Sequence, residues 1–406
     1  MKRKILFVTP HLPDEQSGHA GSVLIYREIE KLNQDYDVTL VSLCTRSELS
    51  HLNRLSHCSQ VLPVIPRKRF KNIAVSKTWN FILEIWNWLR FFLRNEPYWI
   101  SKYYFPHFAE ELTQLNKSND IDIAIFESSI MAQYVHNVKA KIKIVREHEI
   151  PFKMIEEYQN RTRSFFQRKY WKFQHQKWIR YFENIYKHFD KIVTLTDEDK
   201  SVLSQIVKSD KITTMPPGIV INPLTKPSKI QNSLFFMGAF NRRANRVALN
   251  NFIGNIFPKI LEKLPDTELW IIGNKPPARF TKTPPDGVNF IGFIDEIEEF
   301  LEKGSVFIAP ILVGSGLKMK ILHAMARALP VVTTKVGSEG ISAQNEKDLI
   351  IAKDDDAFIN GIVSLLSNEK KRAKMGKNAR KFVQNMHSVE ADTTRWIDLI
   401  EQLCRE

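Results

Sequence analysis

The stretch from Ile308 to Ile341 constrains the fold of this chain more than any other. It predicts a buried strand at 306–309, a glycine loop at 314–316, an amphipathic helix, and a second buried strand at 331–334. Pro330 separates the helix from the second strand, because proline cannot continue a helix. A strand, a helix and a strand in this order form the parallel unit of α/β proteins. The stretch therefore predicts a doubly wound α/β fold.

The glycine loop of this stretch suits an anion. Gly314, Ser315 and Gly316 stand between a strand and a helix start, where unpaired backbone N–H groups and the positive end of the helix dipole point at one spot. Lys318 and Lys320 follow in the first turn, where the dipole disfavours cations, so a bound diphosphate would offset their charge. An ordinary strand-to-helix turn with two solvated lysines explains the local pattern equally well.

A longer pattern resembles the donor-binding segment of retaining GT-B glycosyltransferases of the family-four type (glycosyl transferases group 1), in their surface-polysaccharide branch. The likeness rests on Pro310, Gly314–Gly316, Lys318, Lys320–Leu322, Ala324–Ala326, Pro330–Thr334 and Val336–Gly340. It implies that a nucleotide sugar binds along this segment, including Leu317 and Glu339. Many members have two glutamates eight positions apart, the second holding the ribose. This chain departs from that pattern, since Ser315 and His323 stand at those positions.

The resemblance implies an α/β GT-B fold, with two Rossmann-like doubly wound domains facing each other across a cleft. We expect an acceptor-binding domain at 1–222 with aromatic and basic helical insertions, and a nucleotide-sugar-binding domain at 230–386. A helix at 387–406 would cross back to the first domain. The proline-rich residues between the two domains predict a linker.

Candidate residues of the first domain follow its predicted strands. Gly18 and His19 match the family's first loop, which meets the donor phosphates and the acceptor, although a tight turn with a solvent-facing histidine is the alternative. Ser22 is expected to cap the helix that ends at Leu32. The strand at 142–145 runs directly into Arg146-Glu147-His148-Glu149, at the strand end where open parallel sheets bind ligands.

His148 is therefore the predicted acceptor-side catalytic group, with Glu149 or Glu147 beside it. A solvated strand end is the competing interpretation. His19 is a further catalytic candidate.

The second domain offers more donor-binding candidates. Residues 238–245 lie after a strand and before a helix, and Arg242, Arg243 or Arg246 would replace the family's usual diphosphate cations. The resemblance also implies that the nucleobase lies near Phe293 and Ile294.

Charge and composition bear on partners. The chain of 406 residues carries a formal net charge of +14, and two segments, 67–117 and 161–189, interleave aromatic with basic residues. Such helices suit an anionic membrane interface, while core packing and stacking on single-stranded nucleic acid are the alternatives. We expect the membrane surface rather than nucleic acid. Three scattered cysteines, and the expected lack of a secretory or membrane-spanning segment, predict a cytoplasmic protein, peripheral at the inner face of the cell membrane.

The predicted function is transfer of a sugar from a nucleotide-sugar donor to a hydroxyl of a glycan or lipid-linked glycan, with retention, in surface-polysaccharide or glycoconjugate synthesis. No cofactor and no metal are expected, because cationic side chains would stabilise the departing diphosphate. The Asp120–Asp122 and Asp354–Asp356 runs lack a matching His/Cys set. Two alternatives stay open. One is a non-catalytic basic protein that binds membrane or nucleic acid with a decayed donor pocket, and the other is a GT-B sugar-nucleotide epimerase or phosphorylase.

Overall fold

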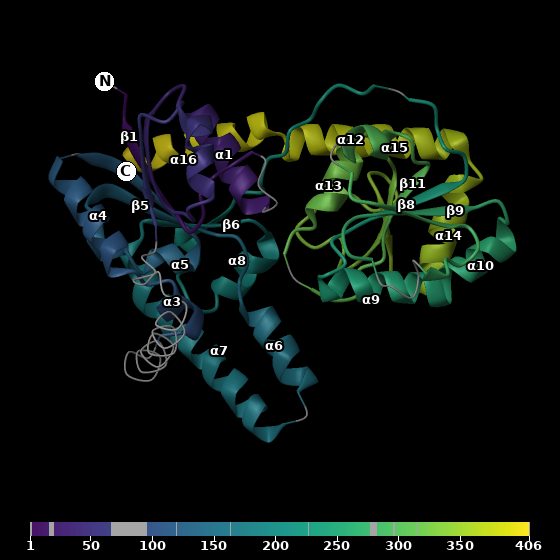
Figure 1. Ribbon diagram of the computed structural model, residues 1–406, viewed down its shortest axis with the longest axis horizontal. Coiled ribbons are helices and arrows are strands. Elements are labelled where there is room, and N and C mark those ends of the chain that lie inside the picture. Colours follow the sequence, from purple (N-terminus) through teal and green to yellow (C-terminus); the bar gives the residue numbers. More distant parts are fainter. Residues whose placement is uncertain are drawn as a thin grey trace. The chain divides into compact units, whose positions relative to one another are not determined.

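The computed structural model describes residues 2–15, 20–65, 96–118, 120–162, 164–225, 227–276, 282–294, 297–314 and 316–405. They form two compact units, called here the first unit (1–215 with 393–406) and the second unit (216–392), shown in Figure 1. The candidate residues Gly18, His19 and Ser315 lie outside the described residues, as does most of the aromatic and basic segment at 67–117.

The first unit contains a fully parallel sheet of seven strands in the order β3-β2-β1-β4-β5-β6-β7. The strands are β1 Lys4–Thr9, β2 Asp37–Leu43, β3 Gln60–Val64, β4 Ile121–Glu127, β5 Ala140–Glu147, β6 Lys191–Thr194 and β7 Ile212–Thr214. Parallel strands need crossover connections, so helices cover both faces and the central strands are apolar almost throughout.

The two faces of this sheet bury different side chains of the same strand. In β1, Ile5 and Phe7 pack on one face with α1 (Ala20–Leu32) and with Trp396 of α16 (Val389–Arg405). Leu6 and Val8 pack on the other face, because successive side chains of a strand point to opposite sides. The remaining helices of the first unit are α3 Tyr98–Lys102, α4 Pro106–Ser118, α5 Ser128–Ala132, α6 Phe152–Arg161, α7 Phe165–Ile185 and α8 Asp197–Leu203.

The second unit repeats the same winding. Its parallel strands follow the order β10-β9-β8-β11-β12-β13, so the first and fourth strands of each unit are neighbours. The strands are β8 Ser233–Met237, β9 Glu268–Ile272, β10 Val288–Gly292, β11 Val306–Ala309, β12 Val331–Thr334 and β13 Ile350–Ala352. The helices are α9 Arg243–Asn251, α10 Phe257–Lys263, α12 Ile297–Glu302, α13 Met319–Ala326, α14 Asp355–Leu366 and α15 Glu369–Met386. The predicted doubly wound α/β class is confirmed.

Two helix starts differ in how they are capped. Thr196 caps α8, since its hydroxyl accepts a hydrogen bond from the Asp199 N–H. The prediction for Ser22 is wrong, because α1 already begins at Ala20 and Ser22 lies inside it. The Ser22 hydroxyl instead donates to the Leu12 carbonyl and accepts from the Asp14 N–H, so it fastens the preceding loop to the helix.

The helical segment from Arg243 to Lys263 is interrupted by a π-helical turn at Phe252–Ile256, which joins α9 to α10. Its buried side chains recur every four residues, as the pairs Ala248/Leu249, Phe252/Ile253 and Ile256/Phe257. An α-helix turns once in about 3.6 residues, so a strict spacing of four drifts around it. The wider π-turn absorbs this drift and keeps all three pairs on the core side.

Candidate donor and acceptor sites

The donor candidates gather at the carboxyl edge of the second sheet. β8 and β11 are neighbours whose connections leave in opposite directions, and ligands of doubly wound sheets bind in the crevice outside such a pair of strand ends. Residues 238–242 follow β8, and residues 310–318 follow β11. The two loops singled out from the sequence therefore flank this switch point.

Glycine backbone, without side chains, forms part of this sheet edge at Gly238 and Gly273. A Cβ on Gly273 would lie 2.0 Å from the Gly238 carbonyl oxygen, and Gly273 has a φ of +137°. The Gly238 N–H donates to the Ile272 carbonyl at 2.9 Å, and the Gly273 N–H donates to the Gly292 carbonyl at 2.7 Å. Glycine is required here because any side chain at 273 would separate the ends of β8 and β9.

Lys320 joins the two loops. Its Nζ donates to Asn245 Oδ1 at 2.7 Å and to the Met237 carbonyl at 3.2 Å, while Asn245 Nδ2 donates to the Ala239 carbonyl at 2.9 Å. Burial, together with the nearby charges of Lys318 and Arg242, lowers the pKa of Lys320 to about 7. An anion placed here would favour the charged amine.

Lys318 lies at the entrance to α13. Its Nζ donates to the Gly316 carbonyl at 2.5 Å and lies 3.9 Å from Glu339 Oε2. Gly314 and Gly316 have φ angles of +111° and +73°, which disfavour any residue with a Cβ. A Cβ on Gly314 would lie 3.7 Å from the Ala244 Cβ, so the loop that carries Lys318 reaches the first turn of α9.

The three arginines proposed for the diphosphate differ in their surroundings. Arg242 and Arg243 are exposed at the start of α9. Arg246 instead donates from Nη1 to the carbonyls of Phe240 and Asn241, at 2.8 and 2.6 Å. Arg246 therefore holds the loop at 238–242, and Arg242 and Arg243 are the more accessible cations.

His323, which the resemblance predicts to lie at the ribose, lies against α12. Its Nδ1 is 3.9 Å from Glu298 Oε1, and the same carboxylate is 2.8 Å from Arg327 Nη2. Burial lowers the pKa of His323, Glu298 opposes this, and Arg327 lowers it further. The chain thus places an imidazole near a carboxylate at this position, whereas many family members have the carboxylate itself there.

Large apolar side chains are exposed at the same sheet edge. Phe293, directly after β10, is 65 % exposed, and Ile291 and Leu312 are also exposed. Ile294 and Leu317 are half-buried. An exposed ring at the carboxyl end of a strand offers a flat surface for a nucleobase.

In the first unit, a buried charge cluster lies at the carboxyl ends of β4 and β5. Arg146 donates from Nε and Nη2 to the two carboxylate oxygens of Glu127, at 2.9 and 2.8 Å, and from Nη1 to Glu28. All three side chains are fully buried, and the Trp396 ring centroid lies 5.3 Å from the Arg146 guanidinium. Burial alone would raise the pKa of Glu127, but Arg146 and His148 hold it below its usual range.

His148 lies at the accessible side of this cluster. Its Nε2 is 2.9 Å from Glu127 Oε2, and its side chain is 27 % exposed. A histidine held by a buried carboxylate has its tautomer and orientation fixed, as a catalytic imidazole requires. The sequence prediction missed Glu127, although it follows the strand at 121–126 as directly as Arg146 follows the strand at 142–145.

The prediction that Glu147 lies beside His148 is wrong. Consecutive residues of a strand point to opposite faces, so Glu147 is buried on the other side of the sheet and accepts a hydrogen bond from the Tyr186 hydroxyl. Burial raises the pKa of Glu147 to about 8, against the effect of its hydrogen bonds to Tyr186 and Ser129. Glu149 is exposed just beyond His148.

His11 was not predicted as a site residue from the sequence. It is close enough to His148 for the two side chains to interact electrostatically. Burial lowers the pKa of His11, Glu48 raises it, and His148 lowers it. His11 follows β1 and Glu127 ends β4, so both lie at the switch point of the first sheet.

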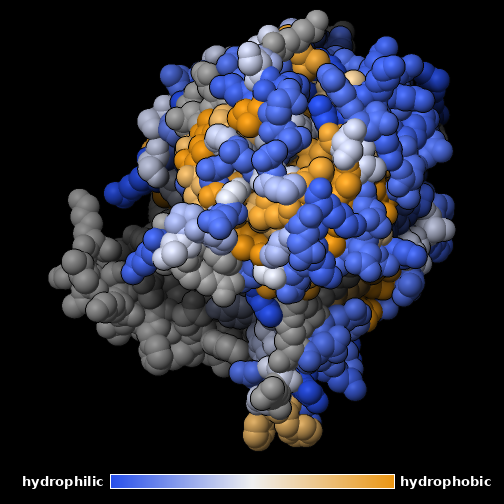
Figure 2. Space-filling view, turned by 90° about the vertical axis from the view of Figure 1, so that its right-hand side faces the viewer, coloured by the Kyte–Doolittle hydropathy of each residue, from blue (hydrophilic) through white to orange (hydrophobic). Residues whose placement is uncertain are grey.

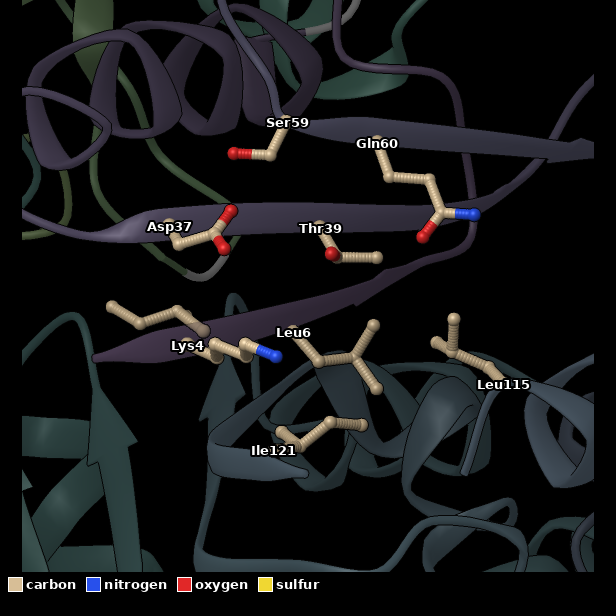
Figure 3. Close-up of a pocket in the computed structure, with 9 residues that line it drawn as sticks. Lys4, Leu6, Asp37, Thr39, Ser59, Gln60, Leu115 and Ile121 are labelled. Atoms are coloured by element: carbon tan, nitrogen blue, oxygen red, sulfur yellow. The ribbon is translucent and has the colours of Figure 1, made fainter. Parts of the chain in front are cut away.

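A pocket of about 210 Å³ in the first unit lies elsewhere (Figure 3). Lys4, Asp37, Gln60 and Ile121, which line it, begin β1, β2, β3 and β4. The pocket is therefore at the amino ends of the strands, whereas His148 follows the carboxyl end of β5.

The described part of the chain bears on metal binding and on membrane spanning. There, no group of three or more His, Cys, Asp or Glu side chains is arranged to hold a metal ion. Among the same residues, no helix combines the length and the apolar character needed to cross a bilayer. The cysteines Cys44, Cys58 and Cys404 are unpaired thiols, and burial raises the pKa of Cys44 to about 11.

Comparisons with known proteins agree with this geometry. The structure of Anabaena HepE in complex with UDP covers 98 % of this chain and all of that one, with a TM-score of 0.68 at 12 % identity. Sucrose-phosphate synthase from Thermosynechococcus elongatus covers 99 % of this chain and all of that one, with a TM-score of 0.66 at 15 % identity. The fold is therefore that of the GT-B glycosyltransferases, as predicted.

The sequence comparisons match part of the chain to a known family. Residues 231–368 match the family model described as glycosyl transferases group 1. An uncharacterized 44.6 kDa protein in the cps region of Klebsiella pneumoniae is 24 % identical over 291 residues, which are 67 % of this chain and 72 % of that protein.

Proposed function

We propose that this protein transfers a sugar from a nucleotide-sugar donor to a hydroxyl of a glycan or lipid-linked glycan. The observation that carries the proposal is the carboxyl edge of the second sheet, where bare glycine backbone, Lys318 and Lys320 surround the switch point between β8 and β11. The family match over 231–368 supports this assignment, as does the similarity to a protein whose structure contains UDP.

In the proposed donor complex, the diphosphate lies against the loops at 238–242 and 314–318. Lys318, Lys320, Arg242 and Arg243 offset its charge. The nucleobase lies near Phe293 and Ile294, and His323 is the hydrogen-bonding group at the ribose. Preorganised N–H groups and cations stabilise the charge that grows on the leaving diphosphate, so the reaction needs no bound metal. The acceptor attacks on the face that the diphosphate leaves, with retention.

The first unit supplies the acceptor side in this proposal. His148, oriented by Glu127, accepts or positions the proton of the attacking hydroxyl. The buried Arg146 keeps Glu127 ionised, so the carboxylate remains a hydrogen-bond acceptor for the imidazole. Glu149 and His19 remain proposed contributors.

We also propose that the protein works at the inner face of the cell membrane in surface-polysaccharide synthesis. The α6–α7 hairpin, which lies at the bottom of Figures 1 and 2, ends in Phe165 and Phe166, which are 62 % and 82 % exposed. Lys169 Nζ lies 4.6 Å from the Phe165 ring centroid. The opposite end of α7 is core, because Trp178, Tyr181 and Phe182 are buried. Exposed rings beside cations suit an anionic lipid interface. The relative from a cps region supports the pathway.

Incubation with a panel of nucleotide sugars, with and without lipid-linked acceptors, tests the central proposal. We expect a donor to raise the melting temperature and to be consumed when the acceptor is present, also with a chelator added. Mass spectrometry of both substrates separates transfer from epimerisation, which would convert the donor without an acceptor. The proposal fails if no nucleotide or nucleotide sugar binds.

A further inference from the structure

The second unit contains a cavity at the edge of its sheet opposite the donor candidates. It measures about 690 Å³ and is lined by the segment around Leu224 to Gln231, by residues before β11 and β12, and by α15. Gly304 and Ser305 precede β11, whereas the donor loop follows it, so the cavity faces the amino ends of the strands. Its volume lies within the range of sites for small organic ligands.

Cations dominate this cavity. The charged residues that line it are Lys229, Arg327, Arg372, Lys377, Arg380, Lys381, Glu302 and Glu369. Arg327 lies 3.2 Å from Glu302 and 2.8 Å from Glu298, so carboxylates already balance it. Among the lining residues that the structure describes, five cations then remain against Glu369.

Two half-buried arginines of this group donate to neutral backbone oxygens. Arg372 Nη1 donates to the carbonyls of Leu365 and Leu366, at 3.1 and 3.0 Å. Arg380 donates to the Ala326 carbonyl and, at 3.0 Å, to the Asn222 carbonyl. Carbonyl groups orient a guanidinium but leave its positive charge in place.

The cations are also close enough to disfavour one another. Burial lowers the pKa of Arg380, and Arg327 lowers it further, whereas Glu302 opposes the change. Burial likewise lowers the pKa of Lys229, with Glu302 opposing and Arg372 adding to the effect. A bound anion would relieve this repulsion.

The wall that carries most of these cations is held in place by close backbone packing. A Cβ on Gly376 of α15 would lie 2.1 Å from the Ala328 carbonyl oxygen, and Ala328 has a φ of +54°. The helix therefore lies directly on the turn before β12. Leu224, Pro227, Ala328, Pro330 and Ala373 add apolar surface to the same cavity. The cavity thus presents fixed positive charge beside apolar side chains.

We propose that this cavity is a binding site for an organic phosphate, with the phosphate held by the cations of α15 and Lys229 and the apolar part placed against Leu224 and Pro330. The site is separate from the donor site, and it is independent of the function proposed above. A soluble metabolite and a lipid headgroup share this chemistry.

Two probes distinguish these sources: inorganic pyrophosphate, and short-chain dihexanoyl phosphatidic acid below its micelle concentration. Hydrogen–deuterium exchange of the full-length protein localises binding to 224–231 and 369–386. The test variant carries Lys377→Ala and Lys381→Ala, which are exposed lysines at the cavity rim. The matched control carries Lys370→Ala and Lys374→Ala, two exposed lysines of the same helix that do not line the cavity.

We expect at least one probe to protect both segments, and the rim variant to weaken that binding by roughly fivefold relative to the control variant. Protection by phosphatidic acid that exceeds protection by pyrophosphate assigns a lipid headgroup. Equal protection assigns a soluble phosphate. Absence of protection in both segments with both probes, or equal weakening in the rim and control variants, overturns the proposal.

Discussion

The Nε2 atom of His148 lies 2.9 Å from Oε2 of Glu127, a carboxylate with no exposed surface. Glu127 is held on its other side by Arg146, which is itself buried. The buried pair of Glu127 and Arg146 therefore fixes the orientation of the accessible imidazole, which does not depend on solvent. This arrangement distinguishes a positioned histidine from the solvated strand end that the sequence also allowed.

His148→Ala should lower the rate of transfer to the acceptor by about a hundredfold or more, because general acid–base groups contribute at this scale. Donor binding should change little, since His148 belongs to the first unit. Turnover and UDP affinity, measured separately, check both parts. His107→Ala, which replaces another half-exposed histidine of the first unit, is the control. Unchanged turnover in His148→Ala would remove the catalytic assignment.

Lys318→Ala should weaken UDP binding by about thirtyfold, since a charge-assisted hydrogen bond to phosphate contributes about 2 kcal/mol. Lys353→Ala, at an exposed lysine of the same unit, should have no effect. Isothermal titration calorimetry measures both. Equal affinities in the two variants would place the diphosphate elsewhere.

Lys320 should take up a proton when UDP binds. Its pKa is lowered to about 7, so at pH 8 the amine is mostly neutral, and a bound diphosphate raises that pKa. The diphosphate itself is already deprotonated at pH 8, since the last phosphate ionisation lies near pH ~6. Calorimetry in buffers of different ionisation enthalpy should show uptake of about one proton, and affinity should fall as pH rises above 7. Lys320→Met should lose the uptake. The same uptake in the variant would assign the proton to another group.

Glu147 should make the protein less stable as pH rises from about 4.5 to 8. In this window the folded state keeps the proton, because burial raises the pKa of Glu147 to about 8, while the unfolded state has lost it. The unfolding free energy should fall by at most about 1.4 kcal/mol per pH unit. Glu147→Gln should flatten that slope in urea unfolding, and Glu110→Gln, at an exposed carboxylate, should not. Parallel slopes for Glu147→Gln and the parent would contradict a protonated Glu147.

Phe165→Ala with Phe166→Ala should lower binding to anionic vesicles by about tenfold, because both rings lose the apolar area that enters the interface. Phe293→Ala with Leu312→Ala removes two exposed apolar side chains from the second unit and serves as the matched control. Vesicle co-sedimentation at low and physiological salt measures both variants. If both double variants bind vesicles as the parent does, the membrane proposal for this hairpin fails.

The sequence predicted well where a pattern is local. Short apolar runs, helical spacing, Pro330 and the glycine loop located β11, α13 and β12. It predicted less well where a side chain finds its partner across the fold. Ser22 resembles a helix cap, but it bonds to the loop at Leu12. Glu147 directly precedes His148 in the chain, but its side chain lies on the opposite face of the sheet.

The charge cluster around Arg146 shows why contacts between distant parts of the chain could not be predicted from the sequence. Glu28 lies in α1 and is separated from Arg146 by 118 positions, and Trp396 lies in the last helix. No spacing rule joins such residues, because the order of strands in the sheet brings them together. Lys320 is a similar case, since its contacts with Asn245 and Met237 depend on β8 and β11 being neighbours.

The π-turn at Phe252–Ile256 has a consequence for comparing this chain with its relatives. A wide turn accommodates an additional residue in what is otherwise a continuous helix. Ungapped alignment of this helix with a regular one therefore mismatches every position beyond the turn by one. A Cβ on Gly254 would meet nothing within 4 Å. A one-residue deletion near Gly254 is therefore the change that would convert this helix into a regular α-helix, or the reverse, as sequences diverge.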